Sequence, residues 1–184
     1  YHPADERDAC GVGLIAAIDG KPRRSVVEMG IDALKAVYHR GAVDADGKTG
    51  DGAGIHVQIP VRFFYDQVRR TGHEPDMNKL IAVGQVFLPR TDFGAQERCR
   101  TIVEAEVLRM GHYIYGWRHV PSDISVLGEK ALATRPEIEQ ILIRCENGAD
   151  AEQFERELYI IRRRIEKAAT KAGIQGMYLC SRSE

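Results

Sequence analysis

The chain has 184 residues, of which 43% are hydrophobic and 29% charged, and its formal net charge is −1 at pH 7. These values are typical of one globular domain, and they exclude a disordered or collagen-like chain. The charge balance also disfavours a nucleic-acid or membrane-surface protein, because both usually carry a basic excess that holds phosphates.

Neither a membrane span nor a secretory signal is predicted. The longest apolar run, Val12–Ile18, is too short to cross a bilayer, and residues 1–9 lack the basic and apolar regions of a signal peptide. Cysteines stand at positions 10, 99, 145 and 180, with no CxxC spacing. Scattered cysteines without a signal peptide indicate reduced thiols and a cytoplasmic protein.

The first third of the chain begins with a polar stretch, residues 1–9, which we expect to be a dispensable leader. The apolar run 10–18 predicts a buried strand. A Ser-x-x-Glu capping box then predicts a helix over 25–38. A Gly- and Asp-rich loop over 42–54 and an alternating strand over 55–59 follow.

The rest of the chain alternates between helical and strand periodicity. The predicted elements are, in order, a short helix opened by Pro60, a strand over 80–88, a helix capped by Thr91 and running to 110, strands over 112–120 and 138–145, a long helix over 154–168, and a strand over 177–180. This order suits a layered α/β or α+β domain, and periodicity alone leaves both open.

Cys10 is the first candidate for chemistry, because it opens a predicted strand and is followed by Gly11 and Gly13, which let a ligand approach the backbone closely. If residues 1–9 were removed, this residue would supply both a thiol nucleophile and a free α-amine that titrates near neutral pH. The alternative is an ordinary buried cysteine in a strand, and the residues alone leave both interpretations open.

The second candidate is the segment His39–Asp46 together with Thr49–Gly54. It is not a phosphate-binding loop, because it has no GxxxxGK[ST] motif and neither follows a strand nor opens a helix. Asp44, Asp46 and Asp51 do not have the ligand order of an EF-hand. A flexible surface loop remains the alternative to a functional one.

The remaining candidates favour structural roles. Cys99, Cys145 and Cys180 fall at positions that predict core packing, and no histidines have metal-site spacing. The run Arg162–Arg164 predicts a solvated helix face rather than a nucleic-acid patch. Its expected partners are the acidic residues Glu155, Glu157 and Glu166.

Taken together, the motifs resemble one family. Cys10-Gly-Val-Gly, followed by His39-Arg-Gly-Ala and Thr49-Gly-Asp-Gly-Ala-Gly54, is similar to the N-terminal glutamine amidotransferase domain of glutamate synthase large subunits. The likeness covers 10–184 and continues through Phe63-Phe64, 80–88, Arg135–Gln140 and 154–162. It implies an α+β fold, the αββα four-layer sandwich of Ntn hydrolases, of which residues 10–184 are the N-terminal part and 1–9 a propeptide.

The resemblance also implies roles for individual residues. Cys10 matches the nucleophile, whose thiolate attacks the side-chain amide of L-glutamine, releases ammonia and leaves a thioester that water hydrolyses to glutamate. Arg40 matches an arginine beside the catalytic cysteine, and Gly41, Asp51 and Gly52 are supporting residues of the same loop. No residue of this segment is expected to bind a cofactor or metal.

Further parts of the enzyme are expected beyond residue 184. They are the remaining glutamine-binding residues and the synthase domains with FMN and an iron–sulfur cluster, which make glutamate from 2-oxoglutarate and ammonia. This segment alone is therefore expected to be inactive, and its electron donor is either an NADPH-oxidising subunit or ferredoxin. The alternatives are a non-catalytic Ntn-fold interaction fragment and another N-terminal-cysteine amidohydrolase, such as an acylase or a conjugated bile acid hydrolase.

Overall fold

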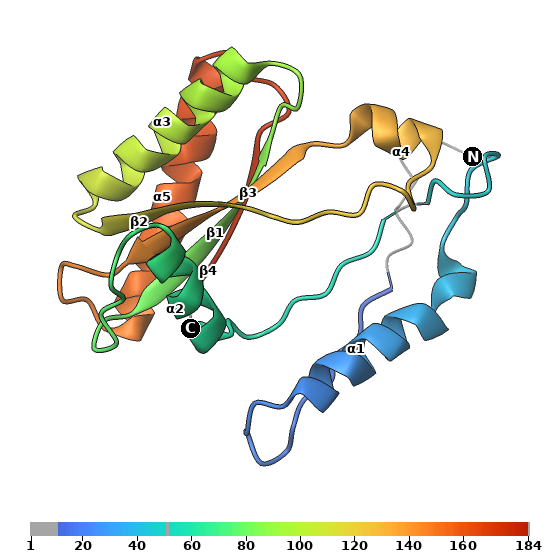
Figure 1. Ribbon diagram of the computed structural model, residues 1–184, viewed down its shortest axis with the longest axis horizontal. Helices are drawn as coiled ribbons and strands as arrows, with labels where there is room; N and C mark the ends of the chain where they lie inside the picture. The colour runs from blue at the N-terminus through green and yellow to red at the C-terminus, as the bar shows by residue number, and fades with distance from the viewer. Residues whose placement is uncertain (1–10, 51, 184) are drawn as a thin grey trace, which may run out of the picture. The chain divides into compact units, whose positions relative to one another are not determined.

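A computed structural model of the chain describes residues 11–50 and 52–183 (Figure 1). The chain forms two compact units. We call the first the loop unit, made of the residues up to 57 together with 124–134, and the second the sheet unit, made of 58–123 and the residues from 135 onward.

The sheet unit is built on a four-stranded antiparallel sheet of order β2-β3-β1-β4. Its strands are β1 (Ile81–Leu88), β2 (Tyr113–His119), β3 (Glu137–Arg144) and β4 (Tyr178–Ser183). The two central strands pair from Ile81 opposite Arg144 to Leu88 opposite Glu137. All four strands lie where periodicity predicts them.

Helices cover both faces of this sheet (Figure 1). On one face lie α3 (Phe93–Arg109) and α5 (Ala151–Lys171), and on the other lies α2 (Val61–Arg70). The core beneath α3 and α5 includes Val86, Leu88, Cys99, Val103, Val107, Ile141, Ile143, Phe154, Leu158 and Ile165. Beneath α2 it consists of Ile59, Phe64, Val68, Ile81, Val83, Tyr115 and Leu142. The hydrophobic residues that define the predicted periodicity are thus largely the buried ones.

The starts of α3 and α5 show how the sequence sets helix boundaries. Asp92 accepts a hydrogen bond from the backbone N–H of Ala95 at 2.8 Å, and Asp150 accepts one from Gln153 at the same distance. Both carboxylates satisfy a backbone donor that has no partner within the helix. The prediction that Thr91 caps the first of these helices is wrong by one residue.

The arginine run on α5 is partly a surface feature and partly a link between helices. Arg162 and Arg163 both pair with Glu166, as predicted. Arg164 instead pairs with Glu106 of α3, at 2.6 Å, and the Glu106 side chain is only 9% exposed. This run therefore helps to hold α3 against α5. The predicted solvated face is confirmed for Arg162 and Arg163 but is incomplete for Arg164.

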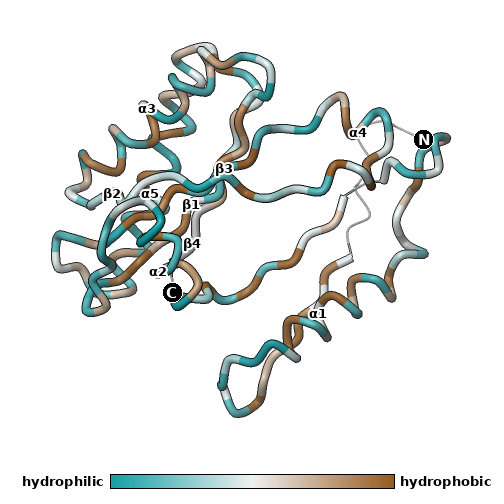
Figure 2. Tube along the Cα trace, viewed as in Figure 1, coloured by the Kyte–Doolittle hydropathy of each residue, from teal (hydrophilic) through white to brown (hydrophobic). Residues whose placement is uncertain are grey.

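The loop unit contains α1 (Arg24–Ala36), the 3-10 turn η2 (Tyr38–Arg40) and α4 (Glu129–Thr134). Hydrophilic and hydrophobic residues alternate along α1 (Figure 2), which agrees with the predicted amphipathic helix. The predicted capping box is wrong, because the helix begins at Arg24 and no side chain caps its first turn. Helix α4 was not predicted.

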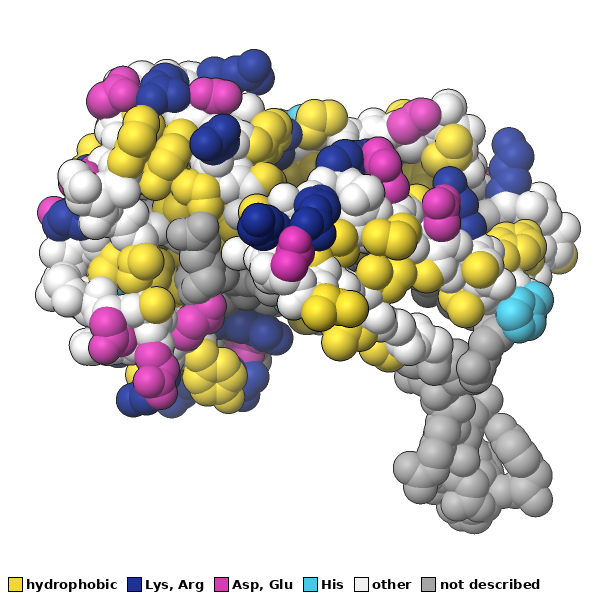
Figure 3. All heavy atoms as spheres, turned by 90° about the horizontal axis from the view of Figure 1, so that it is seen from below, with side chains coloured by type: hydrophobic (Ala, Val, Ile, Leu, Met, Phe, Trp, Pro, Cys, Tyr) yellow, Lys and Arg dark blue, Asp and Glu magenta, His cyan; other side chains and the backbone are white. Residues whose placement is uncertain are grey.

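Two predicted strands are absent from the described residues. Neither 11–18 nor 55–59 is a strand, and Val12, Leu14 and Ile18 are almost fully exposed. An apolar run forms a strand only when a neighbouring strand satisfies its backbone groups, and no described residue pairs with either segment. In Figure 3 hydrophobic side chains accordingly reach the surface among charged ones.

The mixture of helices with an antiparallel sheet confirms the α+β class. Among the residues described, no helix is long and apolar enough to cross a membrane.

Candidate active-site loop

The structure describes part of the predicted site. Cys10 and Asp51 lie outside the described residues. The backbone of Arg40 ends η2, and the N–H of Gly41 donates to the carbonyl oxygen of Tyr38 at 3.0 Å. This hydrogen bond ties the start of the loop to the end of the preceding helical turn.

Gly52 has a φ of +89°, a conformation that side-chain-bearing residues rarely adopt. A glycine is therefore needed there for backbone reasons alone. The backbone conformation alone thus explains one glycine of the Gly-rich motif, and no ligand is needed to explain it.

Between these positions lies a compact turn, residues 43–50, which we call the Asp46 turn. Its ends are joined by a bridge between Val43 and Gly50, and the N–H of Asp44 donates to the carbonyl oxygen of Thr49 at 2.7 Å. The Asp46 carboxylate accepts from the backbone N–H of Thr49 at 2.7 Å and from its hydroxyl at 2.5 Å. These bonds, with those from Lys48 and Glu129, lower the pKa of Asp46 to about 2. The turn thus has a defined hydrogen-bonded conformation, and its residues lie mostly at the surface.

The other cysteines differ in exposure. Cys99 and Cys145 are buried, and burial raises the pKa of both thiols. A raised pKa reduces the thiolate fraction, so neither is suited to nucleophilic chemistry. Cys180 is exposed, and the prediction that it packs in the core is wrong: it is paired with Gln85, while its neighbour Leu179, paired with Val86, is the buried one.

Two parts of the motif pattern, Phe63 and Gln140, meet at one arginine in the sheet unit. The Arg118 guanidinium lies over the Phe63 ring at 5.2 Å and donates to Gln140 Oε1 at 2.7 Å. The Gln140 amide then donates to Gln85 Oε1 at 2.9 Å. This chain of contacts crosses three strands and gives the motif residues a structural role.

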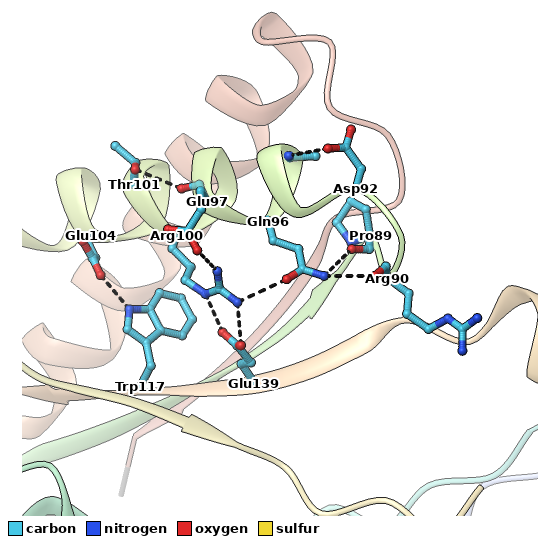
Figure 4. Close-up of polar contacts among 11 residues, drawn as sticks. Pro89, Arg90, Asp92, Gln96, Glu97, Arg100, Thr101, Glu104, Trp117 and Glu139 are labelled. Atoms are coloured by element: carbon cyan, nitrogen blue, oxygen red, sulfur yellow. Dashed lines mark hydrogen bonds and ion pairs between the residues drawn. The ribbon is translucent and has the colours of Figure 1, made fainter.

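The sheet unit also carries a surface cleft of about 550 Å³ at the start of α3. It is lined by Arg90, Thr91, Phe93, Gln96, Arg135, Glu137 and Glu139. Arg100 binds Glu139 through two hydrogen bonds of 2.8 and 2.7 Å, and Gln96 donates to the carbonyl oxygen of Pro89 at 2.8 Å (Figure 4). No predicted site residue lines this cleft.

The described residues do not provide a ligand set for a metal or an iron–sulfur cluster. No three His, Cys, Asp or Glu side chains among them are grouped as such a centre requires.

Comparison with known proteins shows the family to which this chain belongs. Residues 10–184 match the family model of class-II glutamine amidotransferases. The chain belongs to this family, and the predicted membership is confirmed. Membership also removes the alternative of another N-terminal-cysteine Ntn amidohydrolase, such as an acylase.

Within the class, the similar curated proteins are glutamate synthases. The chain is 67% identical over 183 residues to the glutamate synthase [NADPH] large chain of Azospirillum brasilense, covering 100% of this chain and 12% of that protein. It is 41% identical over 179 residues to ferredoxin-dependent glutamate synthase 2 of Synechocystis, and 37% identical over 179 residues to the chloroplastic ferredoxin-dependent enzyme of Spinacia oleracea. These two alignments cover 96% and 97% of this chain and 11% of each relative. The chain thus spans roughly an eighth to a ninth of the length of these relatives.

Proposed function

We propose that this chain is the glutamine-hydrolysing part of a glutamate synthase, with Cys10 as its nucleophile. The observation that supports this most directly is where the family match begins, which is at Cys10 itself. A nucleophile that becomes the first residue of the mature chain explains why the family pattern starts there and does not include residues 1–9.

In this proposal the thiolate of Cys10 attacks the side-chain amide carbon of glutamine. The C–N bond then breaks, ammonia leaves with a proton delivered by the α-ammonium group, and a γ-glutamyl thioester remains on the sulfur. Water adds to the thioester, glutamate leaves, and the thiol is restored. The free α-amine of Cys10 acts as the base, since its unperturbed pKa lies near 8.

Arg40, Gly41, Asp51 and Gly52 support this reaction by shaping the space around Cys10. Arg40 follows the helical turn η2, and Gly52 holds its left-handed backbone on the far side of the Asp46 turn. The complete domain is the four-layer αββα sandwich, in which further strands pair with the apolar segments 11–18 and 55–59.

The ammonia is used by other parts of the enzyme to make glutamate from 2-oxoglutarate. Those parts carry FMN and an iron–sulfur cluster, and the reductant reaches them from a partner. We favour an NADPH-oxidising subunit over ferredoxin, because identity is 67% to the NADPH-named relative and 41% or less to the ferredoxin-dependent ones. A cytoplasmic location stays a prediction from the cysteine pattern.

The test is covalent labelling of the full-length enzyme with an electrophilic diazoketone analogue of glutamine. We expect one label, on Cys10, and loss of glutamine-dependent activity in step with labelling. Cys180→Ser is the matched control, because Cys180 is the exposed thiol among the described cysteines. That variant should label and react as the parent does.

Intact-mass measurement of the same protein tests the leader. We expect the active enzyme to begin at Cys10 and a form that retains residues 1–9 to lack glutamine-dependent activity, because the α-amine is then a peptide nitrogen. Full glutamine turnover by a protein that begins at Tyr1 would contradict the assignment of the base. Labelling mainly at Cys99, Cys145 or Cys180, or none at Cys10, would instead favour a non-catalytic fragment.

A further inference from the structure

The Asp46 turn rests against a glycine far away in the sequence. Gly128 immediately precedes α4, and a Cβ atom at this position would lie 2.2 Å from the Thr49 hydroxyl oxygen and 2.6 Å from the Thr49 backbone nitrogen. Real Cβ atoms essentially never make non-bonded contacts this short, and the second contact involves backbone that no side-chain rotation can move away. Any side chain at Gly128 must therefore displace the turn.

This glycine is needed for space and not for its backbone conformation. Gly128 is absent from the glycines with positive φ, so other residues can adopt its conformation. Gly47, within the turn, is the opposite case: its φ is +66° and nothing lies within 4 Å of an added Cβ. Of the described residues in the loop unit, Gly128 alone is buried, which marks the contact with the turn as the tightest packing there.

Two polar contacts join the same segments. The Asp46 carboxylate accepts a hydrogen bond from the backbone N–H of Glu129, and Lys130 Nζ lies 2.5 Å from Asp44 Oδ2. The segment Gly128–Lys130 thus holds the turn through one close approach, one hydrogen bond and one ion pair.

The turn separates the two halves of the predicted site. Arg40 and Gly41 come just before it, and Asp51 and Gly52 come just after it. Since the described part of the loop unit has no buried hydrophobic side chain, packing of the usual kind does not fix this loop. The contact with Gly128–Lys130 therefore holds the turn that joins the two halves of the predicted site in the sequence.

We propose that Gly128–Lys130 is a positioning element for glutamine hydrolysis, which fixes the Asp46 turn and through it the placement of the flanking Arg40–Gly41 and Gly52. Gly128 is a positioning residue and touches no substrate. The inference rests on the proposed function, because it assigns the loop to the cysteine's site. Displacing catalytic groups by about 1 Å is enough to lower a rate by roughly 10²-fold.

The test is Gly128→Ala in the full-length, processed enzyme, with both nitrogen donors measured. We expect kcat for glutamine to fall by roughly 10- to 100-fold while KM for glutamine changes by less than about threefold. Glutamate synthesis from added ammonia should stay at the parent rate, because it does not use Cys10. Gly94→Ala is the matched control: it adds the same methyl group at the start of α3, where the nearest atoms lie at 3.4 Å, and should leave both reactions unchanged.

Asp46→Asn provides a second variant if Gly128→Ala folds poorly. It keeps the size of the side chain but removes the charge, so we expect a smaller fall in kcat for glutamine and faster hydrogen exchange within 41–50. Unchanged glutamine kcat in both variants would overturn the proposal. Equal losses of the glutamine and ammonia reactions would also overturn it, because they would show a general loss of fold.

Cys10→Ser separates this proposal from the proposed function. If Cys10→Ser abolishes the glutamine reaction while Gly128→Ala and Asp46→Asn both have the parent kcat, the positioning role alone is wrong. If Cys10→Ser retains glutamine turnover, the function proposed for the loop is wrong, and the positioning role fails with it.

Discussion

Different kinds of contact stabilise the interior of each of the two units. All of the buried hydrophobic side chains in the described residues belong to the sheet unit, where three helices and a four-stranded sheet enclose them. The loop unit, as described, keeps its shape through hydrogen bonds to Asp46, an ion pair and the close approach at Gly128. Stability is therefore concentrated in one unit, and the predicted chemistry in the other.

This division teaches what a substitution in each unit should change. Apolar burial contributes about 25 cal/mol per Å², so damage to the sheet unit should appear as lost stability. A polar turn contributes little free energy but fixes geometry, so damage to the loop unit should appear as lost turnover. The predictions that follow test this contrast.

The largest expected effect is in the core of the sheet unit. Phe154 on α5 is fully buried and its ring meets His112 edge-on at 5.0 Å. Phe154→Ala should destabilise the unit by about 3–5 kcal/mol, through lost transfer energy and a cavity. In the full-length protein, hydrogen exchange in β1 and β3 should then become faster by roughly two to four orders of magnitude. Tyr159→Ala, on the exposed side of the same helix, is the control and should leave exchange nearly unchanged.

Arg40→Lys is the corresponding change in the loop unit. Lysine keeps the positive charge but loses the planar guanidinium, so we expect kcat for glutamine to fall by roughly 10²-fold with stability of the sheet unit unchanged. Steady-state kinetics with glutamine, alongside exchange in β1 and β3, measures both. A raised KM with unchanged kcat would mean that Arg40 binds the substrate carboxylate instead of placing Cys10.

Much of the sheet unit could be predicted from sequence, and much of the loop unit could not. Strands such as 80–88 and helices such as 154–168 can be recognised because the spacing of apolar residues within each segment already shows its period. The run 10–18 is equally apolar, yet its described part is not a strand, since pairing depends on partners that periodicity does not reveal.

The site shows the same limit. Motif residues identify the family, but the residues next to Gly128 in the sequence do not indicate that it contacts a turn about 80 residues earlier. Helix α4 begins directly after Gly128, at Glu129, and it is too short to show a clear helical period in the sequence. Close approach between distant segments becomes visible only in three dimensions.

A smaller effect is expected from pH on the sheet unit. The His112 side chain is fully buried, its Nε2 lies 3.1 Å from Glu157 Oε2, and burial lowers the pKa of His112 despite this carboxylate. Because the unfolded chain binds a proton near pH 6.5 and the folded one resists it, stability should be complete above pH 6.5 and fall below it, by at most about 1.4 kcal/mol per pH unit.

Hydrogen exchange of β2 and β3 between pH 5 and 8, corrected for intrinsic rates, measures this dependence. His112→Gln cannot take up the proton and should flatten the profile in that range. A profile of equal slope in the variant would assign the pH effect to another group.

The smallest effect should come from the ion pair at the Asp46 turn. The Lys130 side chain is 71% exposed and that of Asp44 29%, so solvent screens the pair, which contributes roughly 0.2–1 kcal/mol. Lys130→Gln should therefore lower kcat for glutamine by less than about threefold. Added salt should reduce the difference from the parent. Lys48→Gln, which removes a positive charge from within the turn, is the control for charge alone. A loss as large as that of Gly128→Ala would mean that charge, and not close approach, fixes the turn.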